Sequence, residues 1–193
     1  GGLGRAIATA ILRNTDLGII DICRTDSTNF FQNFNRGKNT RYHHLEFDLS
    51  NPKNVKYLYL EKIRPIGIIQ GLVNNAAYAY DDIVSNANYE YLQKMFAINV
   101  FSPIMLTKYI IRDFLLNGTK GSLVHITSVS SKTGYKGLGM YGSTKGAMEA
   151  FSKNVSREWG VKGIRSNCVS PGFMDTKMSE SLDVDQKERI YQR

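Results

Sequence analysis

The chain has few cysteines and no long apolar run. Its two cysteines, Cys23 and Cys168, lie in separate apolar stretches, which indicates buried thiols in a reducing compartment rather than a disulfide framework. No apolar run approaches the roughly 18 residues that a membrane-spanning helix needs, and no signal-peptide pattern opens the sequence. We therefore expect a soluble, cytoplasmic protein that does not contact membranes.

The chain also lacks a metal-ligand spacing and a basic cluster. Its three histidines show no ligand spacing with the cysteines, so we expect no metal site. The formal net charge is +8, but the basic residues are scattered, with no run of five and no aromatic-interleaved basic patch. Nucleic acid is therefore not an expected partner. A basic surface explains most of the charge, and a phosphate-rich ligand would explain a small part.

Apolar runs alternate with helix-compatible stretches along the whole chain. The runs read as buried strands at residues 17–23, 41–47, 66–77, 122–127 and 164–169. Helices are expected at 1–14, 50–63, 89–116 and 140–159, with weaker helical character at 25–39 and 176–193. In the first helix, the periodicity predicts one apolar stripe made of Ala6, Ile7, Ala10 and Ile11.

Continuous apolar strands joined by helices indicate a parallel sheet with helices on both faces. The predicted fold is α/β, a Rossmann-type doubly wound sheet in a single domain over residues 1–193. In such folds, ligands bind beyond the carboxyl ends of the strands. The residues at those ends are Cys23 and Arg24, Asp48, 74–77, Ser128, and Pro171 with Gly172.

One strand end carries a possible catalytic set. The strand at 122–127 runs into Ser128, and after a glycine-rich loop a helix starts near Met140. Tyr141 and Lys145 are four residues apart, so the helix presents both on one face. A serine facing such a pair can help a tyrosine donate a proton to a carbonyl oxygen. The pair alone carries no weight, because a chain with 11 tyrosines has about one such spacing by chance. A surface pair on an amphipathic helix is the alternative.

Taken together, these motifs resemble the short-chain dehydrogenase/reductase family over nearly the whole chain. They come in the family's order: Gly2-Leu3-Gly4 as the end of the glycine-rich cofactor turn, Asp48 as the adenine-side acid, Asn74-Asn75-Ala76 as the strand-end motif, Asn99 as the helical asparagine, Ser128 thirteen residues before Tyr141, the YxxxK pair Tyr141 and Lys145, and the Pro171-Gly172 turn. The residues SPGFMDTKM after the last strand are most similar to those of 3-oxoacyl-acyl-carrier-protein reductases.

The resemblance implies an NAD(P)-dependent oxidoreductase that reduces a ketone to a secondary alcohol, with Tyr141 as proton donor. An ammonium about 4 Å from the phenol, at an effective dielectric of about 20, favours the phenolate by roughly 4 kcal/mol, or about three pKa units. Lys145 is therefore expected to bring the pKa of Tyr141 close to neutrality. The implied catalytic set is Asn99, which holds a water linking Lys145 to solvent, Ser128, which orients the carbonyl, Tyr141 and Lys145.

A small-molecule or acyl-carrier-bound carbonyl is the implied substrate, with a 3-oxoacyl thioester favoured and fatty acid biosynthesis as the setting. Its identity is expected to depend on residues 78–86, 129–140 and 174–193. The alternative is a non-catalytic protein on the same scaffold that senses the cofactor or binds nucleic acid. By resemblance, the long apolar helices at 89–116 and 140–159 pair with a neighbour's in a homodimer or homotetramer.

The cofactor is expected to be NADPH rather than NAD. NAD-preferring members carry an acid at the end of the second strand. Here Arg24 follows Cys23 and suits a 2′-phosphate, while Asp21 lies too early and Asp26 too late. Asp48 either accepts from the adenine amino group or caps the helix after Pro52. The full set of expected cofactor contacts is Gly2, Leu3 and Gly4 at the pyrophosphate, Arg24, Asp48 with Leu49 beside it, Asn74 and Ala76 on the ribose and nicotinamide side, Lys145 on the nicotinamide ribose with Tyr141, and Pro171, Gly172 and Thr176 over the carboxamide.

Compared with the family, the sequence starts inside the glycine-rich turn, without the central strand that precedes it, and stops before the last strand. We therefore expect a domain that is incomplete at both ends.

Overall fold

The computed structural model describes residues 2–35 and 40–174 of the 193-residue chain. Five strands are present in this part, and all of their pairings are parallel. They are β1 (Ile19–Cys23), β2 (Tyr42–Glu46), β3 (Gly71–Asn74), β4 (Gly121–Ile126) and β5 (Ile164–Val169). Four lie within a run that the sequence predicts as a strand, and β4 begins one residue before its predicted run; β3 is the most shortened, because pairing begins only at Gly71.

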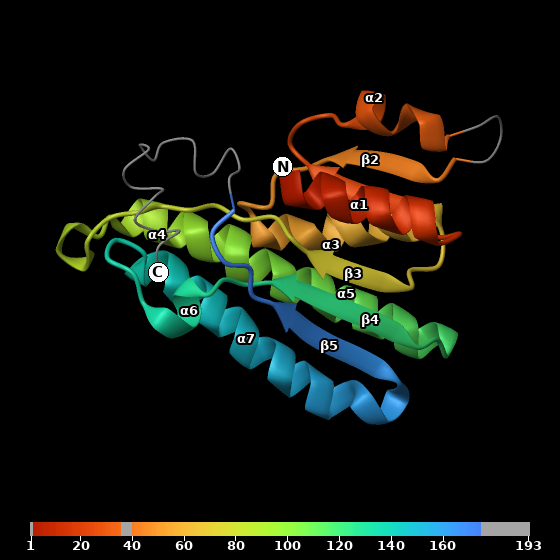
Figure 1. Cartoon of the computed structure of the whole chain (residues 1–193). Coiled ribbons are helices and arrows are strands. Elements are labelled where there is room, and N and C mark those ends of the chain that lie inside the picture. The colour runs from red at the N-terminus through yellow and green to blue at the C-terminus, as the bar shows by residue number, and fades with distance from the viewer. Residues whose placement is uncertain (1, 36–39, 175–193) are drawn as a thin grey trace.

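Helices occupy the connections between the strands (Figure 1). The longer ones are α1 (Gly2–Asn14), α4 (Tyr89–Phe96), α5 (Ser102–Asn117) and α7 (Gly139–Trp159). Two short helices, α2 (Thr28–Phe31) and α6 (Ser130–Thr133), accompany them. Between β2 and β3, residues 52–66 wind continuously through a 3₁₀ turn, α3 (Val55–Tyr57), the π-helical Leu58–Ile63 and a second 3₁₀ turn.

The strands form two hydrogen-bonded sheets. One is β1–β2 and the other is β3–β4–β5, and within the described residues no strand pairs with both β1 and β3. The predicted parallel α/β fold with helices on both faces is therefore confirmed, with its sheet in two parts.

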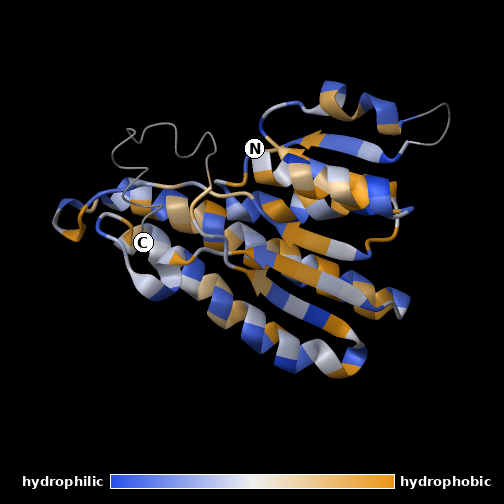
Figure 2. Cartoon of the chain, in the orientation of Figure 1, coloured by the Kyte–Doolittle hydropathy of each residue, from blue (hydrophilic) through white to orange (hydrophobic). Residues whose placement is uncertain are grey.

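The main core lies between the strands and the helices α3 and α5. Ile20 and Ile22 of β1 face this core, where they meet residues such as Leu58, Ile110 and Leu123. Figure 2 shows β3 and β4 as strongly hydrophobic, whereas α7 alternates between hydrophobic and hydrophilic residues along its length. Parallel strands covered on both faces are expected to show this difference from a surface helix.

A smaller core lies on the other side of β1 and β2, where α1 packs. Its members are Ala8 and Leu12 of α1 together with Phe31 and Tyr42. The predicted stripe of Ala6, Ile7, Ala10 and Ile11 is therefore wrong, because Ala6 and Ala10 are exposed. Small apolar residues occur almost all around this helix, so periodicity alone did not fix which face turns inward.

The helix predicted at 89–116 is interrupted by a π turn. The five residues Ala97–Phe101 are π-helical and join α4 to α5. The start of α5 is held by Ser102, whose hydroxyl donates to the carbonyl of Leu49 over 2.7 Å. None of the helices in the described part of the chain is long and apolar enough to cross a membrane.

Candidate active site

The loop after β4 presents Ser128 with its hydroxyl already oriented. The loop is joined to β5 by the backbone N–H of Thr127, which donates to the carbonyl of Val169 over 2.8 Å. The half-buried Ser128 Oγ accepts from the backbone N–H of Ser130 at 3.2 Å and from the Ser130 hydroxyl at 2.9 Å. Both contacts are accepted, so the proton of the Ser128 hydroxyl remains available for a ligand.

Tyr141 and Lys145 lie one turn apart on α7, as the spacing predicts. The ammonium of Lys145 donates to the carbonyl of Ile126 over 2.9 Å. Its nitrogen also lies 5.4 Å from the centre of the Tyr141 ring. Lys145 is only 4% exposed and forms no ion pair with any residue in the described part of the chain. A buried lysine without a carboxylate partner is a frequent mark of a functional site.

Burial changes the proton affinity of both residues. It lowers the pKa of Lys145 to about 8. It also raises the pKa of Tyr141, and the negative charge of Asp81 adds to this increase. The expected fall of the Tyr141 pKa is therefore not found in this structure. The physical reason is that desolvation of the phenolate and the nearby carboxylate outweigh a lysine whose ammonium is bonded to Ile126.

Asn99 sits in the π turn and is 2% exposed. Its amide group exchanges two hydrogen bonds with the backbone of Tyr78, at 2.8 and 2.9 Å. It also donates to the hydroxyl of Thr144 over 3.1 Å, and Thr144 donates to the carbonyl of Tyr141 over 2.7 Å. Asn99 is thereby connected to the first turn of α7. A π turn places an asparagine in an irregular position that regular helix geometry does not offer.

Close packing joins the Ser128 loop to α7. A Cβ atom at Gly142 would lie 3.0 Å from the carbonyl oxygen of Ser130, so a larger residue would press on this carbonyl. Lys145 reaches Ile126, two residues before Ser128. The structure thus brings the segments of Asn99, Ser128, Tyr141 and Lys145 together at the carboxyl end of β4, although they span 47 residues of sequence.

Two residues at this site were not identified from the sequence. Asp81 acts on the charge state of Tyr141, and Thr144 bridges Asn99 to α7. Asp81 lies within residues 78–86, which the sequence associates only with substrate choice. Thr144 directly precedes Lys145 and is fully buried. A small hydroxyl residue next to the predicted catalytic lysine was the only sequence feature that could have indicated its role.

On the cofactor side, the glycines have a different role from the predicted one. Gly2 and Gly4 belong to the first turn of α1 rather than to a turn that precedes it, and Leu3 lies between them. A Cβ atom at Gly4 would lie 2.8 Å from the amide nitrogen of Asn75, directly after β3. The start of α1 therefore approaches the end of β3 closely. A glycine-lined helix N-terminus at strand ends fits the pyrophosphate of a dinucleotide.

The adenine-side residues are fixed to different degrees. The carboxylate of Asp48 accepts from the backbone N–H and the hydroxyl of Ser50, both at 2.9 Å. The Ser50 backbone bond lowers the pKa of Asp48 most, and the charge of Arg24 contributes. The cap of the helical stretch after Pro52 is instead Asn51, which accepts from Lys53. Arg24 is exposed, and its side chain forms no hydrogen bond or ion pair in residues 2–35 and 40–174.

The remaining expected cofactor residues lie at strand ends. The side chain of Asn74 turns inward, where it donates to Thr107 over 3.3 Å and lies 3.0 Å from Nδ1 of His125. Ala76 is exposed, and Leu49 packs against the core. The carbonyl of Pro171 accepts from the backbone N–H of Val129 at 3.2 Å, which places the Pro171-Gly172 segment against the Ser128 loop. Thr176 lies outside the described residues.

The sequence is similar to curated oxidoreductases. It is 30% identical over 190 residues to the 3-oxoacyl-[acyl-carrier-protein] reductase FabG of Escherichia coli, which is 98% of this chain and 76% of the relative. It is 34% identical over 120 residues to Carbonyl reductase [NADPH] 2 of Sus scrofa, which is 62% of this chain and 49% of the relative. The matched region thus covers about half of the pig enzyme.

Solved structures share the fold. A gluconate 5-dehydrogenase from Burkholderia cenocepacia, solved with NADP and tartrate, superposes with a TM-score of 0.83 at 20% identity, covering 98% of this chain and 74% of that one. A 4-hydroxyisoleucine dehydrogenase solved with NADH and succinate gives 0.77 at 22% identity, covering 95% and 79%. The family model for short chain dehydrogenase matches residues 1–187. This chain belongs to the short chain dehydrogenase family.

Proposed function

We propose that the chain reduces a ketone to a secondary alcohol with NADPH, and that Tyr141 donates the proton. The observation that carries this proposal is the buried ammonium of Lys145 beside the ring of Tyr141, with no carboxylate partner among residues 2–35 and 40–174. Burying a lysine without a carboxylate costs stability, so the arrangement calls for a reason other than packing.

The charge states at the site suit a proton donor. Because the pKa of Tyr141 is raised, its phenol carries a proton at neutral pH and is in the acid form. As the proton moves to a carbonyl oxygen, negative charge develops on Tyr141 close to Lys145. At about 5 Å and an effective dielectric of about 20, an ammonium stabilises such a charge by roughly 3 kcal/mol. These features favour reduction as the direction of the reaction.

The other residues would position the substrate. The free proton of the Ser128 hydroxyl can donate to the same carbonyl oxygen, since its lone pairs already accept from Ser130. Asn99 and Thr144 hold the first turn of α7 in place. A nicotinamide cofactor, when bound, supplies the hydride that completes the reduction.

NADPH is the proposed cofactor because Arg24 is an exposed cation at the end of β1 whose side chain no described residue engages in a hydrogen bond or ion pair. The one acid within β1, Asp21, is instead bonded to the hydroxyl of Tyr42 at 2.7 Å. The pig relative, named for its use of NADPH, is consistent with this choice. Gly2, Leu3 and Gly4, the last of which lies against Asn75, would hold the pyrophosphate.

A 3-oxoacyl thioester is the proposed substrate, on the similarity to the Escherichia coli reductase. The loop before α7 supports an apolar entrance, because Tyr135 and Leu138 are half-buried there. A role in fatty acid biosynthesis, a cytoplasmic location and a homodimer or homotetramer stay predictions from the sequence. Among the described residues, α5 leaves Leu115 and Leu116 exposed, whereas α7 exposes no large apolar side chain.

NADPH oxidation with an acetoacetyl thioester and, in parallel, with a simple diketone tests the proposal. Turnover of the thioester in preference to the diketone is the expected result. The competing idea, a non-catalytic cofactor sensor or nucleic-acid-binding protein, predicts no turnover with either compound. Steeply salt-dependent DNA binding would favour its nucleic-acid form.

A further inference from the structure

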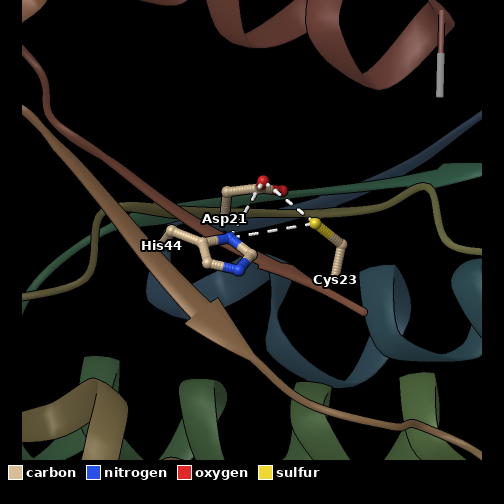
Figure 3. Close-up of side chains that lie close together, drawn as sticks. All are labelled: Asp21, Cys23 and His44. Carbon is tan, nitrogen blue, oxygen red and sulfur yellow. Dashed lines mark hydrogen bonds and ion pairs between the residues drawn. The ribbon is translucent and has the colours of Figure 1, made fainter. Parts of the chain in front are cut away.

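Three chemically active side chains meet on the face of β1 and β2 that α1 covers. Along β1, Ile20 and Ile22 face the main core, so Asp21 and Cys23 project to the opposite face. In the parallel register, Asp21 lies opposite His44 of β2. Figure 3 shows the carboxylate, the thiol and the imidazole pointing toward one another.

The three ligand atoms form a compact triangle. Cys23 Sγ lies 3.3 Å from Oδ2 of Asp21 and 3.8 Å from Nδ1 of His44. The same Asp21 oxygen lies 3.6 Å from His44 Nδ1, which closes the triangle. A point equidistant from three such atoms lies about 2.1 Å from each, within the range of zinc bonds to nitrogen, oxygen and sulfur of about 2.0–2.3 Å.

We propose that Asp21, Cys23 and His44 form a zinc-binding site with water as the fourth ligand. Thiolate, imidazole and carboxylate are the side-chain ligands that Zn²⁺ uses in proteins, and three of them leave one tetrahedral position open. The edges of such a tetrahedron are about 3.3–3.5 Å, so the 3.6 and 3.8 Å edges of this triangle need to shorten by about 0.3 Å. Small rotations of the side chains supply this change, so β1 and β2 need not move.

A buried tyrosine holds the carboxylate in place. The hydroxyl of Tyr42, which is 2% exposed, donates to Oδ2 of Asp21 over 2.7 Å. A hydrogen bond of this kind holds a ligating carboxylate in a fixed orientation. Nδ1 of His44 faces Cys23, whereas Nε2 is buried and has no hydrogen-bond partner in the described structure. The ring is thus directed at the cluster.

Metal uptake would release the thiol proton. Without metal, the thiol of Cys23 donates its proton to the carbonyl of Thr25 over 2.9 Å, so the sulfur is in the thiol form. On binding, the S–H bond breaks, the proton leaves to solvent and the thiolate electron pair forms the bond to zinc. No oxidant or reductant takes part. The ligands are partly exposed, at 31% for the Asp21 side chain and 11% for His44, which leaves a route for the ion.

Sequence spacing did not indicate this site, because 21 residues separate Cys23 from His44 and only strand pairing brings them together. The site also does not depend on the proposed reduction. Zinc binding is measured without cofactor or substrate, so a failed reductase assay and a failed zinc titration are separate results.

The test is a competition titration of the metal-stripped 193-residue chain with Zn²⁺ against a chromophoric chelator. One equivalent is expected to bind with submicromolar Kd, and Co²⁺ is expected to give the visible bands of a tetrahedral site with a thiolate charge-transfer band. Cys23→Ala should weaken binding about 100-fold or more and remove the charge-transfer band. Tyr42→Phe should weaken binding about tenfold, the lower end of the effect of removing a hydrogen bond to a metal ligand.

Cys168→Ala is the matched control, since Cys168 is the other free and half-buried cysteine and lies on β5. It should bind zinc as the wild type does. Absence of saturable binding in the wild type would overturn the proposal, as would unchanged affinity in Cys23→Ala. If Cys23→Ala does not fold, Cys23→Ser replaces it. The proposal then requires a thiolate charge-transfer band with Co²⁺ in the wild type and its loss in Cys23→Ser.

Discussion

The ammonium of Lys145 lies 5.4 Å from the centre of the Tyr141 ring, and both groups are withdrawn from water. In this setting the pKa of Lys145 falls below that of Tyr141, since burial lowers the first and raises the second. Neither residue is fixed by a carboxylate ion pair in the described structure. Tyr141 therefore keeps its proton at neutral pH, which is the form that a proton donor needs.

Asp81→Asn should lower the pKa of Tyr141. The carboxylate of Asp81 disfavours the phenolate, so its neutral replacement removes one of the two causes of the raised value. Spectrophotometric titration of the phenol, with Tyr141→Phe to assign the signal, measures the change. Asp82→Asn is the control, because the carboxylate of Asp82 accepts hydrogen bonds from the backbone N–H of Ile83 and the side-chain amide of Asn86. An unchanged Tyr141 pKa in Asp81→Asn would contradict the electrostatic account.

Lys145→Met should abolish turnover but increase stability. At pH 7 the buried ammonium destabilises the fold, and methionine removes this cost while leaving the carbonyl of Ile126 without its donor. We expect the free energy of unfolding to rise by about 1–2 kcal/mol. Lys153→Met, on the exposed side of α7, should stay within about 0.5 kcal/mol.

The same variant has a pH signature. Lys145 has a folded pKa of about 8, and its unfolded value is about 10.4. Between these values the unfolded state binds more protons, so the stability of the wild type rises with pH. The stability of Lys145→Met relative to the wild type should therefore fall by about 2 kcal/mol from pH 8 to pH 10. Urea titrations at each pH measure it, and a constant difference would show that Lys145 is not desolvated.

His125→Gln should remove part of the acid sensitivity of the fold. Burial lowers the pKa of His125 to about 4, so the folded protein keeps this ring neutral while the unfolded chain protonates it near 6.5. Stability contributed by the neutral ring is present above pH 6.5 and is lost as the pH falls toward 4, by up to about 3 kcal/mol.

In the glutamine variant, the stability difference between pH 6.5 and pH 4 should be smaller by that amount, as measured by denaturant unfolding. Ser166→Ala removes the hydroxyl that lies 3.2 Å from Nε2 of His125 but keeps the imidazole, so its acid sensitivity should persist. Equal acid sensitivity in His125→Gln and the wild type would rule out His125 as the group responsible.

Arg24→Glu should reverse cofactor preference. In the variant, the 2′-phosphate of NADPH no longer faces a cation and is repelled by the new carboxylate. The ribose hydroxyls of NADH gain a hydrogen-bond acceptor. NADPH binding is expected to weaken about 10- to 100-fold, the scale of one charged hydrogen bond, and NADH binding to improve. Fluorescence titration with both cofactors measures this, and Arg157→Glu on α7 is the control for a general charge effect. An unaltered ratio would remove Arg24 from the cofactor site.

Local patterns predicted the elements well. The run before Ser128, the helix with Tyr141 and Lys145, and the parallel order all follow from apolar spacing, which reports burial directly. The orientation of α1 could not be predicted, because apolar positions occur almost all around it. The π turn at Asn99 was also not predictable, since its hydrogen-bond shift depends on contacts with Tyr78 and Thr144.

Electrostatics was the least predictable part of the site. The sequence places Lys145 beside Tyr141, and this spacing led to a predicted fall in the Tyr141 pKa. The direction of the pKa shift depends on the burial of Tyr141 and on Asp81, which lies 60 residues earlier in the sequence. The cluster of Asp21, Cys23 and His44 was missed for the same reason, because strand register rather than spacing brings its members together.

Comparison of Tyr141→Phe with Tyr89→Phe in NADPH-dependent reduction of an acetoacetyl thioester tests the central claim most directly. Tyr89 is 74% exposed at the start of α4, so its variant should keep wild-type activity. Tyr141→Phe should lose about 100-fold or more in turnover, as expected for a general acid, while NADPH affinity changes little. Full turnover in Tyr141→Phe, or none in the wild type with either the thioester or the diketone, would contradict the account.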